Sequence, residues 1–164
     1  MKSKMKIGGV FDVVCIDANG NEKWRDRTHN LVVTEALQHV LDILFTGATQ
    51  VNPWYVGLTG TAPSPAAGDT LASHAGWTEI SAYTGNRQEY VDVRSSQTVT
   101  NSASKASFPI TGTATVGGAF LASAASGTSG TLLCAAAFSG GDRSVISGDT
   151  VEVTYTFSAA DDGA

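Results

Sequence analysis

The chain has 164 residues, only 15% of them charged, and a formal net charge of −5. This length predicts a single domain that buries about 70% of the surface of its unfolded chain and needs no metal or disulfide to fold. An acidic chain lacks the positive charge that neutralises phosphates, and no stretch approaches the length of a transmembrane helix. We therefore expect neither nucleic-acid binding nor a membrane span.

Positive charge is concentrated at the start of the chain. The first thirty residues carry a net charge of +2, whereas the remainder carries −7. We expect residues 1–6 to form a basic arm, in which Lys2, Lys4 and Lys6 either reach an acidic protein partner or remain a solvated disordered tip. The apolar run that follows is interrupted by Asp12 before it reaches the length of a signal peptide.

The next segments predict a hairpin. Residues 7–17 and 22–33 read as strands, and Asn19-Gly20 between them is the strongest short signal for a hairpin turn.

One helix is predicted, over residues 35–46. Thr34 suits its start, and Gly47 suits its end. Four apolar residues recur at the spacing of one buried helix face: Leu37, Val40, Leu41 and Leu44. His39 lies beside that face without a second histidine three or four residues away, so we interpret it as a packed or solvated residue and not as a metal ligand.

A strand over residues 54–59 and a long connection over residues 60–77 follow the helix. Pro53 suits the opening of the strand. Connections longer than about 12 residues in compact domains tend to be functional or disordered. The turn residues in this one favour an ordered binding loop.

Only strands are predicted from residue 78 onwards. They cover residues 78–83, 88–94, 105–111, 115–124, 130–138 and 149–157. With the earlier strands this gives about nine, and we predict a mainly β fold, an antiparallel β-sandwich or jelly roll over residues 7–158, with a flexible acidic tail over residues 159–164.

The stretch 101–141 supports a structural or binding role. It contains one charge, Lys105, and twenty-nine of its forty-one residues are Ala, Ser, Thr or Gly. Such side chains suit tightly stacked sheets and flat contact surfaces, because burying them costs little rotamer entropy and little charge desolvation.

The two cysteines, Cys15 and Cys134, each lie in an apolar run. We expect buried free thiols, although a bridge between two strands remains open from the sequence alone.

Catalytic and cofactor motifs are largely missing. Asp69, Ser73 and His74 supply the residue types of a hydrolase triad, but no nucleophile elbow accompanies them, and an Asx turn explains Asp69 better. The chain has no metal-binding or phosphate-binding motif, so we expect no enzyme and no cofactor. Exposed aromatics could stack on a sugar, although Trp24, Trp54 and Trp77 suit core positions better.

Several segments resemble a family of small virion proteins of tailed bacteriophages and prophages. They cover most of residues 7–157: Asp17-Ala18-Asn19-Gly20 with Trp24, His29-Asn30-Leu31-Val32-Val33, Trp54-Tyr55-Val56-Gly57-Leu58, Pro65-Ala66-Ala67-Gly68-Asp69-Thr70, Ala72-Ser73-His74-Ala75-Gly76-Trp77-Thr78-Glu79, Gly118-Ala119-Phe120-Leu121 and Ser147-Gly148-Asp149-Thr150. The loop around His74 is the most specific of these.

The resemblance implies a capsid decoration or cement protein with a jelly-roll fold on the outer head surface of the virion. Its partners would be the major capsid protein and further copies of itself, as a dimer or trimer, after synthesis in the bacterial cytoplasm. Relatives labelled tail-fibre proteins imply the alternative, a tail-tip or fibre module that binds a host-surface glycan. The interface candidates are Lys2, Lys4, Lys6, Trp54, Tyr55, His74 and Trp77.

Overall fold

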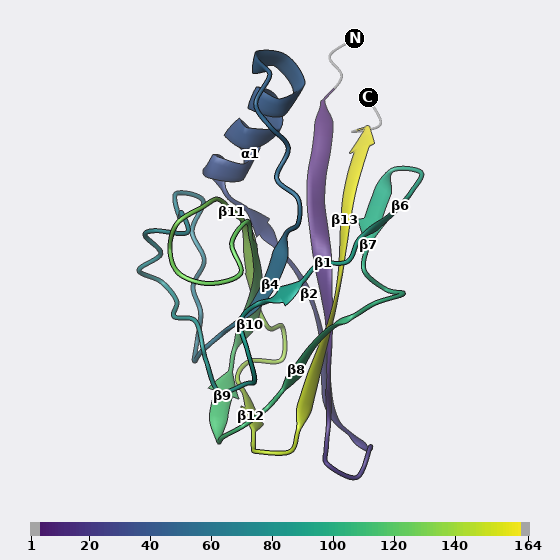
Figure 1. Cartoon of the computed structure of the whole chain (residues 1–164), viewed down its shortest axis with the longest axis vertical. Coiled ribbons are helices and arrows are strands. Elements are labelled where there is room, and N and C mark those ends of the chain that lie inside the picture. The colour runs from purple at the N-terminus through teal and green to yellow at the C-terminus, as the bar shows by residue number, and fades with distance from the viewer. Residues whose placement is uncertain (1–3, 162–164) are drawn as a thin grey trace.

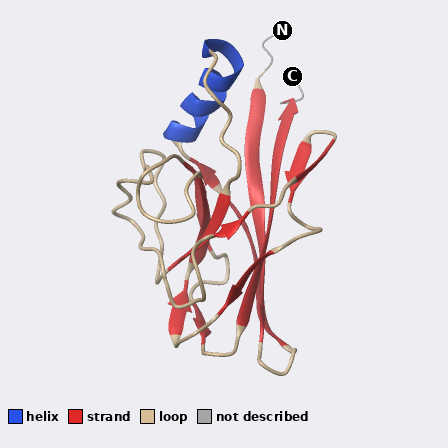
Figure 2. Cartoon of the chain, viewed as in Figure 1, coloured by secondary structure: helices blue, strands red, loops and turns tan. Residues whose placement is uncertain are grey.

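The structure is a computed structural model that describes residues 4–161. Two antiparallel β-sheets face each other, and a short helical segment lies at one end of them, near both chain termini (Figures 1 and 2). The predicted mainly β fold with one short helix is confirmed, and the two facing sheets give it the form of a sandwich.

The larger sheet is built on two long strands. β1 (Met5–Ile16) pairs with β13 (Thr150–Asp161) along the whole length of both. Apolar residues alternate on each strand, so every second side chain faces the other sheet. The remaining strands of this sheet are β2 (Glu22–His29), β6 (Val93–Ser95), β7 (Thr98–Thr100) and β8 (Ala106–Pro109).

The smaller sheet has the order β3-β11-β10-β4-β5. These strands are β3 (Leu31–Val32), β4 (Tyr55–Thr59), β5 (Gln88–Glu89), β10 (Gly118–Ala122) and β11 (Leu132–Ala137). A separate pair consists of β9 (Ala114–Val116) and β12 (Arg143–Val145). All of β10 is buried, which explains why the nearly uncharged stretch of the sequence lies here.

The main core fills the space between the sheets. Phe11, Tyr155 and Phe108 of the larger sheet meet Leu58 and Leu121 of the smaller one, and all are fully or almost fully buried. Burial of such side chains stabilises the fold by about 1.5–3 kcal/mol each relative to exposure.

A second core lies on the opposite face of the smaller sheet. Leu71 and Trp77 of the long connection pack there with Phe120, Leu132 and other residues of the sheet. Gly57 of β4 is required at this face, because a Cβ atom there would overlap the Phe120 ring. The connection over residues 60–77 is therefore ordered by a core of its own.

The helical segment covers almost the range predicted for it, but its geometry and its N-cap differ from the prediction. α1 (Thr34–Leu41) continues as a π-helical turn, η1 (Asp42–Thr46), and Gly47 ends it with a φ of 76°. Val33 and not Thr34 is the N-cap residue, and no side chain caps the helix. The end at Gly47 is confirmed.

The domain boundaries also differ from those predicted. β1 starts at Met5 and β13 extends to Asp161, so part of the predicted arm and of the predicted acidic tail belong to the larger sheet. Lys2 and residues 162–164 lie outside the described residues.

The strand predictions were partly wrong. Residues 78–83 form no strand and make only isolated bridges, at Glu79 and Tyr83. Two strands were not predicted, β7 and β12, each of which has three residues. The segments 22–33, 88–94 and 115–124 each divide into two strands.

Candidate interaction surface

The exposed apolar surface of the helix is the clearest candidate for a contact with another protein. Four side chains on one side of α1 and η1 are between 41% and 78% exposed. We call them the outer helix stripe: Leu37, Leu41, Leu44 and Phe45.

The prediction of a buried face through Leu37, Leu41 and Leu44 was therefore wrong. The helix instead packs through a second set of residues, with Ala36 fully buried and Val40 and Ile43 lining a cavity beneath it. Val40 is the one member of the predicted face that belongs to this set. Both sets have helical spacing, so the helix is apolar on two sides. One side packs against the sheets, and the other remains exposed to solvent.

Further exposed apolar residues lie at the same end of the sandwich. Met5 opens β1 next to the helical end. Val93 lies on the edge strand β6, which β13 and β7 separate from β1, and Val91 lies just before β6 (Figure 1). Of these exposed residues, the outer helix stripe has its members on neighbouring helical turns, and apolar surface gathered in this way marks interaction sites in soluble proteins more often than singly scattered residues do.

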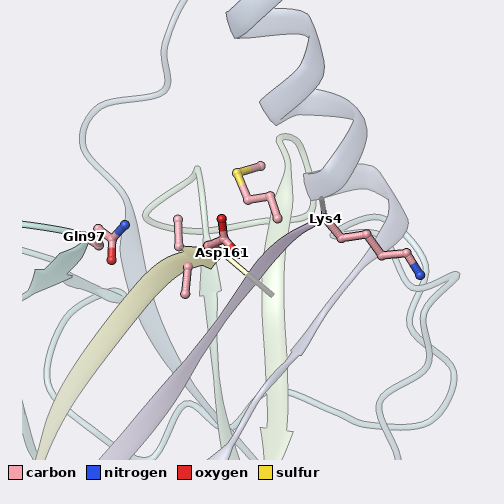
Figure 3. A pocket seen from close by; sticks show the side chains of 6 residues that line it. Lys4, Gln97 and Asp161 are labelled. Carbon is pink, nitrogen blue, oxygen red and sulfur yellow. The ribbon is translucent and has the colours of Figure 1, made fainter. Parts of the chain in front are cut away.

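The two basic candidates that the structure describes also lie at this end. Lys4 precedes β1 and Lys6 is an exposed residue of that strand. A shallow hollow of about 350 Å³ lies beside the paired ends of β1 and β13, with Gln97 on its other side. Figure 3 shows that the Lys4 side chain there points away from Asp161. Positive charge therefore borders the exposed apolar surface.

Trp54 and Tyr55 lie where the segment after the helix enters β4. Both are partly buried. The Trp54 ring lies edge-on to the His39 ring, with the centroids 6.2 Å apart, and it forms part of the cavity wall beneath the helix. His39 therefore packs against an aromatic ring, in line with the prediction of a packed or solvated residue.

His74 and Trp77 lie apart from these residues, in the long connection. Trp77 is only 4% exposed, so it is a core residue and offers no surface for a sugar ring or a partner. His74 stacks on it with the ring centroids 3.7 Å apart, and its Nδ1 lies 3.0 Å from the Trp77 carbonyl oxygen. The predicted interface set is thus divided between two regions.

The residues of the hypothetical triad are not linked as a triad. Asp69 accepts a hydrogen bond from the Trp77 indole at 2.9 Å and another from the Ala66 amide at 3.0 Å. The Ser73 amide bonds to Thr70, closing a turn. These bonds hold the connection in shape.

Arg87 is a structural residue that no sequence pattern revealed. Its guanidinium forms two hydrogen bonds with Glu79 and donates to the carbonyl oxygens of Ala124 and Gly127. It also lies over the Phe120 ring, 5.1 Å from the centroid. The five donors of a guanidinium suit this role, but its partners are distant in the sequence.

Both cysteines are free and buried. Burial raises the pKa of the Cys15 thiol to about 11 and that of Cys134 to about 12. A thiol held protonated in this way is a poor nucleophile, which fits the predicted packing role.

Within residues 4–161, no group of three or more His, Cys, Asp or Glu side chains is placed to hold a metal ion. No helix in this range is both long enough and apolar enough to cross a membrane.

The chain was also compared with known proteins. No protein-family model matches it, and no curated protein matches it.

Proposed function

We propose that the chain is a structural protein of a tailed-bacteriophage virion, a capsid decoration or cement protein. It binds the outer head surface and stabilises contacts between neighbouring major capsid subunits, as a dimer or trimer. Its free energy of binding comes from apolar surface buried against several subunits at once, and attachment at several points raises avidity without strong individual contacts. The partner in this proposal, the major capsid protein, is the one that the resemblance of the sequence to virion proteins implies.

The outer helix stripe is the observation that carries this proposal. Leucine and phenylalanine side chains in this stripe reach 78% exposure at Phe45, although the same helix has a buried side available. Exposed apolar side chains do not stabilise an isolated domain, whereas they provide binding surface in a protein whose function is to contact other proteins. Lys4 and Lys6 border this end and add positive charge for an acidic partner surface.

The glycan-binding alternative receives less support from the geometry. It needs aromatic rings exposed in the segment from residue 52 to residue 79. Trp77, at the end of the long connection, is buried against the smaller sheet, and Trp54 and Tyr55 are each partly buried. We therefore place the contact at the helical end of the sandwich and not at this segment.

Binding to capsids that lack the protein tests the proposal. The purified chain should bind such heads saturably, at many copies per particle, and should raise the temperature at which the heads release DNA. The triple variant Leu41→Gln, Leu44→Gln and Phe45→Gln should lose most of this binding, because glutamine maintains helix propensity while removing the apolar contact.

The matched control is Ile146→Gln. Ile146 is 51% exposed and follows β12, at the end of the sandwich opposite α1 (Figure 1). This variant should bind heads as the unchanged chain does. Saturation at only a few copies per particle, or equal loss in the control and the triple variant, would contradict the proposal.

A further inference from the structure

A cavity of about 300 Å³ lies between the inner side of the helical segment and the two sheets. The helix contributes His39, Val40 and Ile43 to its lining, and the irregular segment after the helix contributes Val51. Both sheets contribute to its lining, the smaller one through Leu121 and Leu133 and the larger one through Tyr155 and Phe157. It is distinct from the exposed stripe on the other side of the helix.

The walls of the cavity are apolar in effect, including those formed by tyrosines. The Tyr90 hydroxyl donates within the protein, with the carbonyl oxygens of Val99 and Tyr155 at 2.9 and 3.1 Å. The Tyr155 hydroxyl accepts a hydrogen bond from Asn30 at 3.0 Å. Both hydroxyls are therefore committed, and the rings of Trp54 and Phe157 complete an aromatic lining.

His39 supplies the one polar atom that this arrangement leaves unsatisfied. Its Nε2 is buried and has no hydrogen-bond partner among the described residues. A buried polar atom without a partner carries a desolvation penalty. Because Nε2 has almost no accessible surface in the empty protein, a bound molecule with a hydrogen-bonding group would relieve this penalty once the His39 ring turns toward the cavity. The exposed residues Gln50, Asn52 and Asp92 mark where the cavity reaches solvent.

The cover of the cavity is the least regular part of the sandwich. The helix changes to π-helical geometry from Asp42 to Thr46, a turn that includes the lining residue Ile43, and residues 47–54 have no helix or strand. π-Helical turns occur frequently at functional sites. Such a cover can admit a molecule without disturbing the long strands.

We propose that this cavity binds a small uncharged ring compound, with its ring between the aromatic walls and its one hydrogen-bonding group at His39 Nε2. The volume suits one or two rings, because apolar cavities of about half this size bind benzene. The uncommitted polar atom favours a hydroxylated ring over a purely apolar one. This binding is independent of the proposed capsid contact.

Phenol and toluene test the proposal, because they differ chiefly in a hydroxyl against a methyl group. Titration into the ¹⁵N-labelled protein should shift the Trp54 indole resonance saturably. The resonances of Trp24 and Trp77, which pack on Phe138 and Phe120, should stay in place. The absence of a saturable Trp54 shift up to the solubility limit of both probes would overturn the proposal.

Variants at His39 test the polar contact through the ratio of the two dissociation constants. His39→Leu should reduce the preference for phenol over toluene about fivefold, the size of one net hydrogen bond, and His39→Gln should restore much of it. An unchanged ratio in His39→Leu would refute the role of Nε2. Use of a ratio cancels changes in cavity shape common to both probes.

Two further variants test the location. Val51→Trp should fill the cavity and abolish binding of both probes, and it changes an irregular segment instead of a strand. Leu41→Gln, on the exposed side of the helix, should leave both dissociation constants unchanged. Retained binding in a folded Val51→Trp protein, verified by circular dichroism, would place the probes elsewhere and refute the assignment.

Discussion

The indole nitrogen of Trp77 donates a hydrogen bond to Oδ2 of Asp69 at 2.9 Å, and both side chains are buried. The same carboxylate oxygen accepts from the Ala66 amide, so a single acid joins the middle of the long connection to its end. Trp77 in turn packs on Phe120, with the ring centroids 4.8 Å apart. A residue of a type that suggests catalysis thus positions a core tryptophan.

We expect Asp69→Ala to lower the free energy of unfolding by about 1–3 kcal/mol, because it leaves the buried indole nitrogen and an amide without an acceptor. Urea denaturation measures the change. The control Asp92→Ala removes an exposed carboxylate and should change the free energy by less than about 0.5 kcal/mol. Equal values for the two variants would show that the bond to Trp77 contributes nothing.

Local patterns predicted the elements that depend on neighbouring residues. The first hairpin formed as expected, with Gly20 at a φ of 85° and the Asp17 carboxylate accepting the amides of Asn19 and Asn21. The alternation from Val151 onwards gave the last strand of the larger sheet. In contrast, β7 and β12 have three residues each, too few for alternation to be recognised.

Contacts between distant residues decided what the sequence could not show. Spacing placed Leu37, Val40, Leu41 and Leu44 on one buried side of the helix. The helix packs instead through Ala36, Val40 and Ile43, and only the position of the sheets determines this. The core position expected for Trp77 is confirmed, but its partner Phe120 lies more than forty positions later in the sequence and could not be predicted. The candidate surface and the cavity therefore emerged only from the fold.

The orientation of the helix leads to a stability prediction. Leu41→Gln with Leu44→Gln should change the free energy of unfolding by less than about 0.5 kcal/mol, because both side chains are already exposed. Ala36→Phe should destabilise by about 1–3 kcal/mol, because it overfills a buried position on the other side. Thermal and urea denaturation measure both.

If the leucine face were buried, the order of stability of these two variants would be reversed. Each leucine would then contribute several kcal/mol, and the double glutamine variant would be the less stable protein. That result would show that the outer helix stripe is covered within the isolated chain.

The buried thiols predict a loss of stability in alkali. Burial, assisted by the nearby Asp149 carboxylate, raises the pKa of Cys15 from 9.0 to about 11, and burial raises that of Cys134 to about 12. Above pH 9 the unfolded chain binds fewer protons at these thiols than the folded one. The free energy of unfolding should therefore fall as the pH rises from about 9 through about 11 and 12, whereas below pH 9 the thiols should give it no pH dependence.

Urea denaturation at several pH values measures this slope, and the double variant Cys15→Ala and Cys134→Ala should show a shallower one. The residual slope should come from buried tyrosines such as Tyr83, whose pKa is raised by burial to about 12. Rapid reaction of both native thiols with a thiol reagent near pH 8 would show that they are accessible and would contradict the prediction.

Arg87 and Arg25 form a matched pair for a test of ion-pair burial. The Arg87 side chain is 3% exposed and bonds to Glu79 and two carbonyl oxygens, whereas that of Arg25 is 62% exposed and bonds to Glu22 alone. Arg87→Ala should lower the free energy of unfolding by about 3–5 kcal/mol, because it leaves Glu79 and both carbonyl oxygens without their donor. Arg25→Ala should cost at most about 1 kcal/mol, because solvent screens an exposed pair.

Arg87→Lys separates charge from geometry at the same position. Lysine maintains the positive charge but cannot reproduce the planar fork that bonds to Glu79 and to the two carbonyl oxygens, so we expect most of the loss to remain. Urea denaturation measures all three variants, with circular dichroism to verify the fold. If Arg87→Lys retained full stability, charge alone would suffice, and the hydrogen bonds of the guanidinium would not hold the long connection against the sheet.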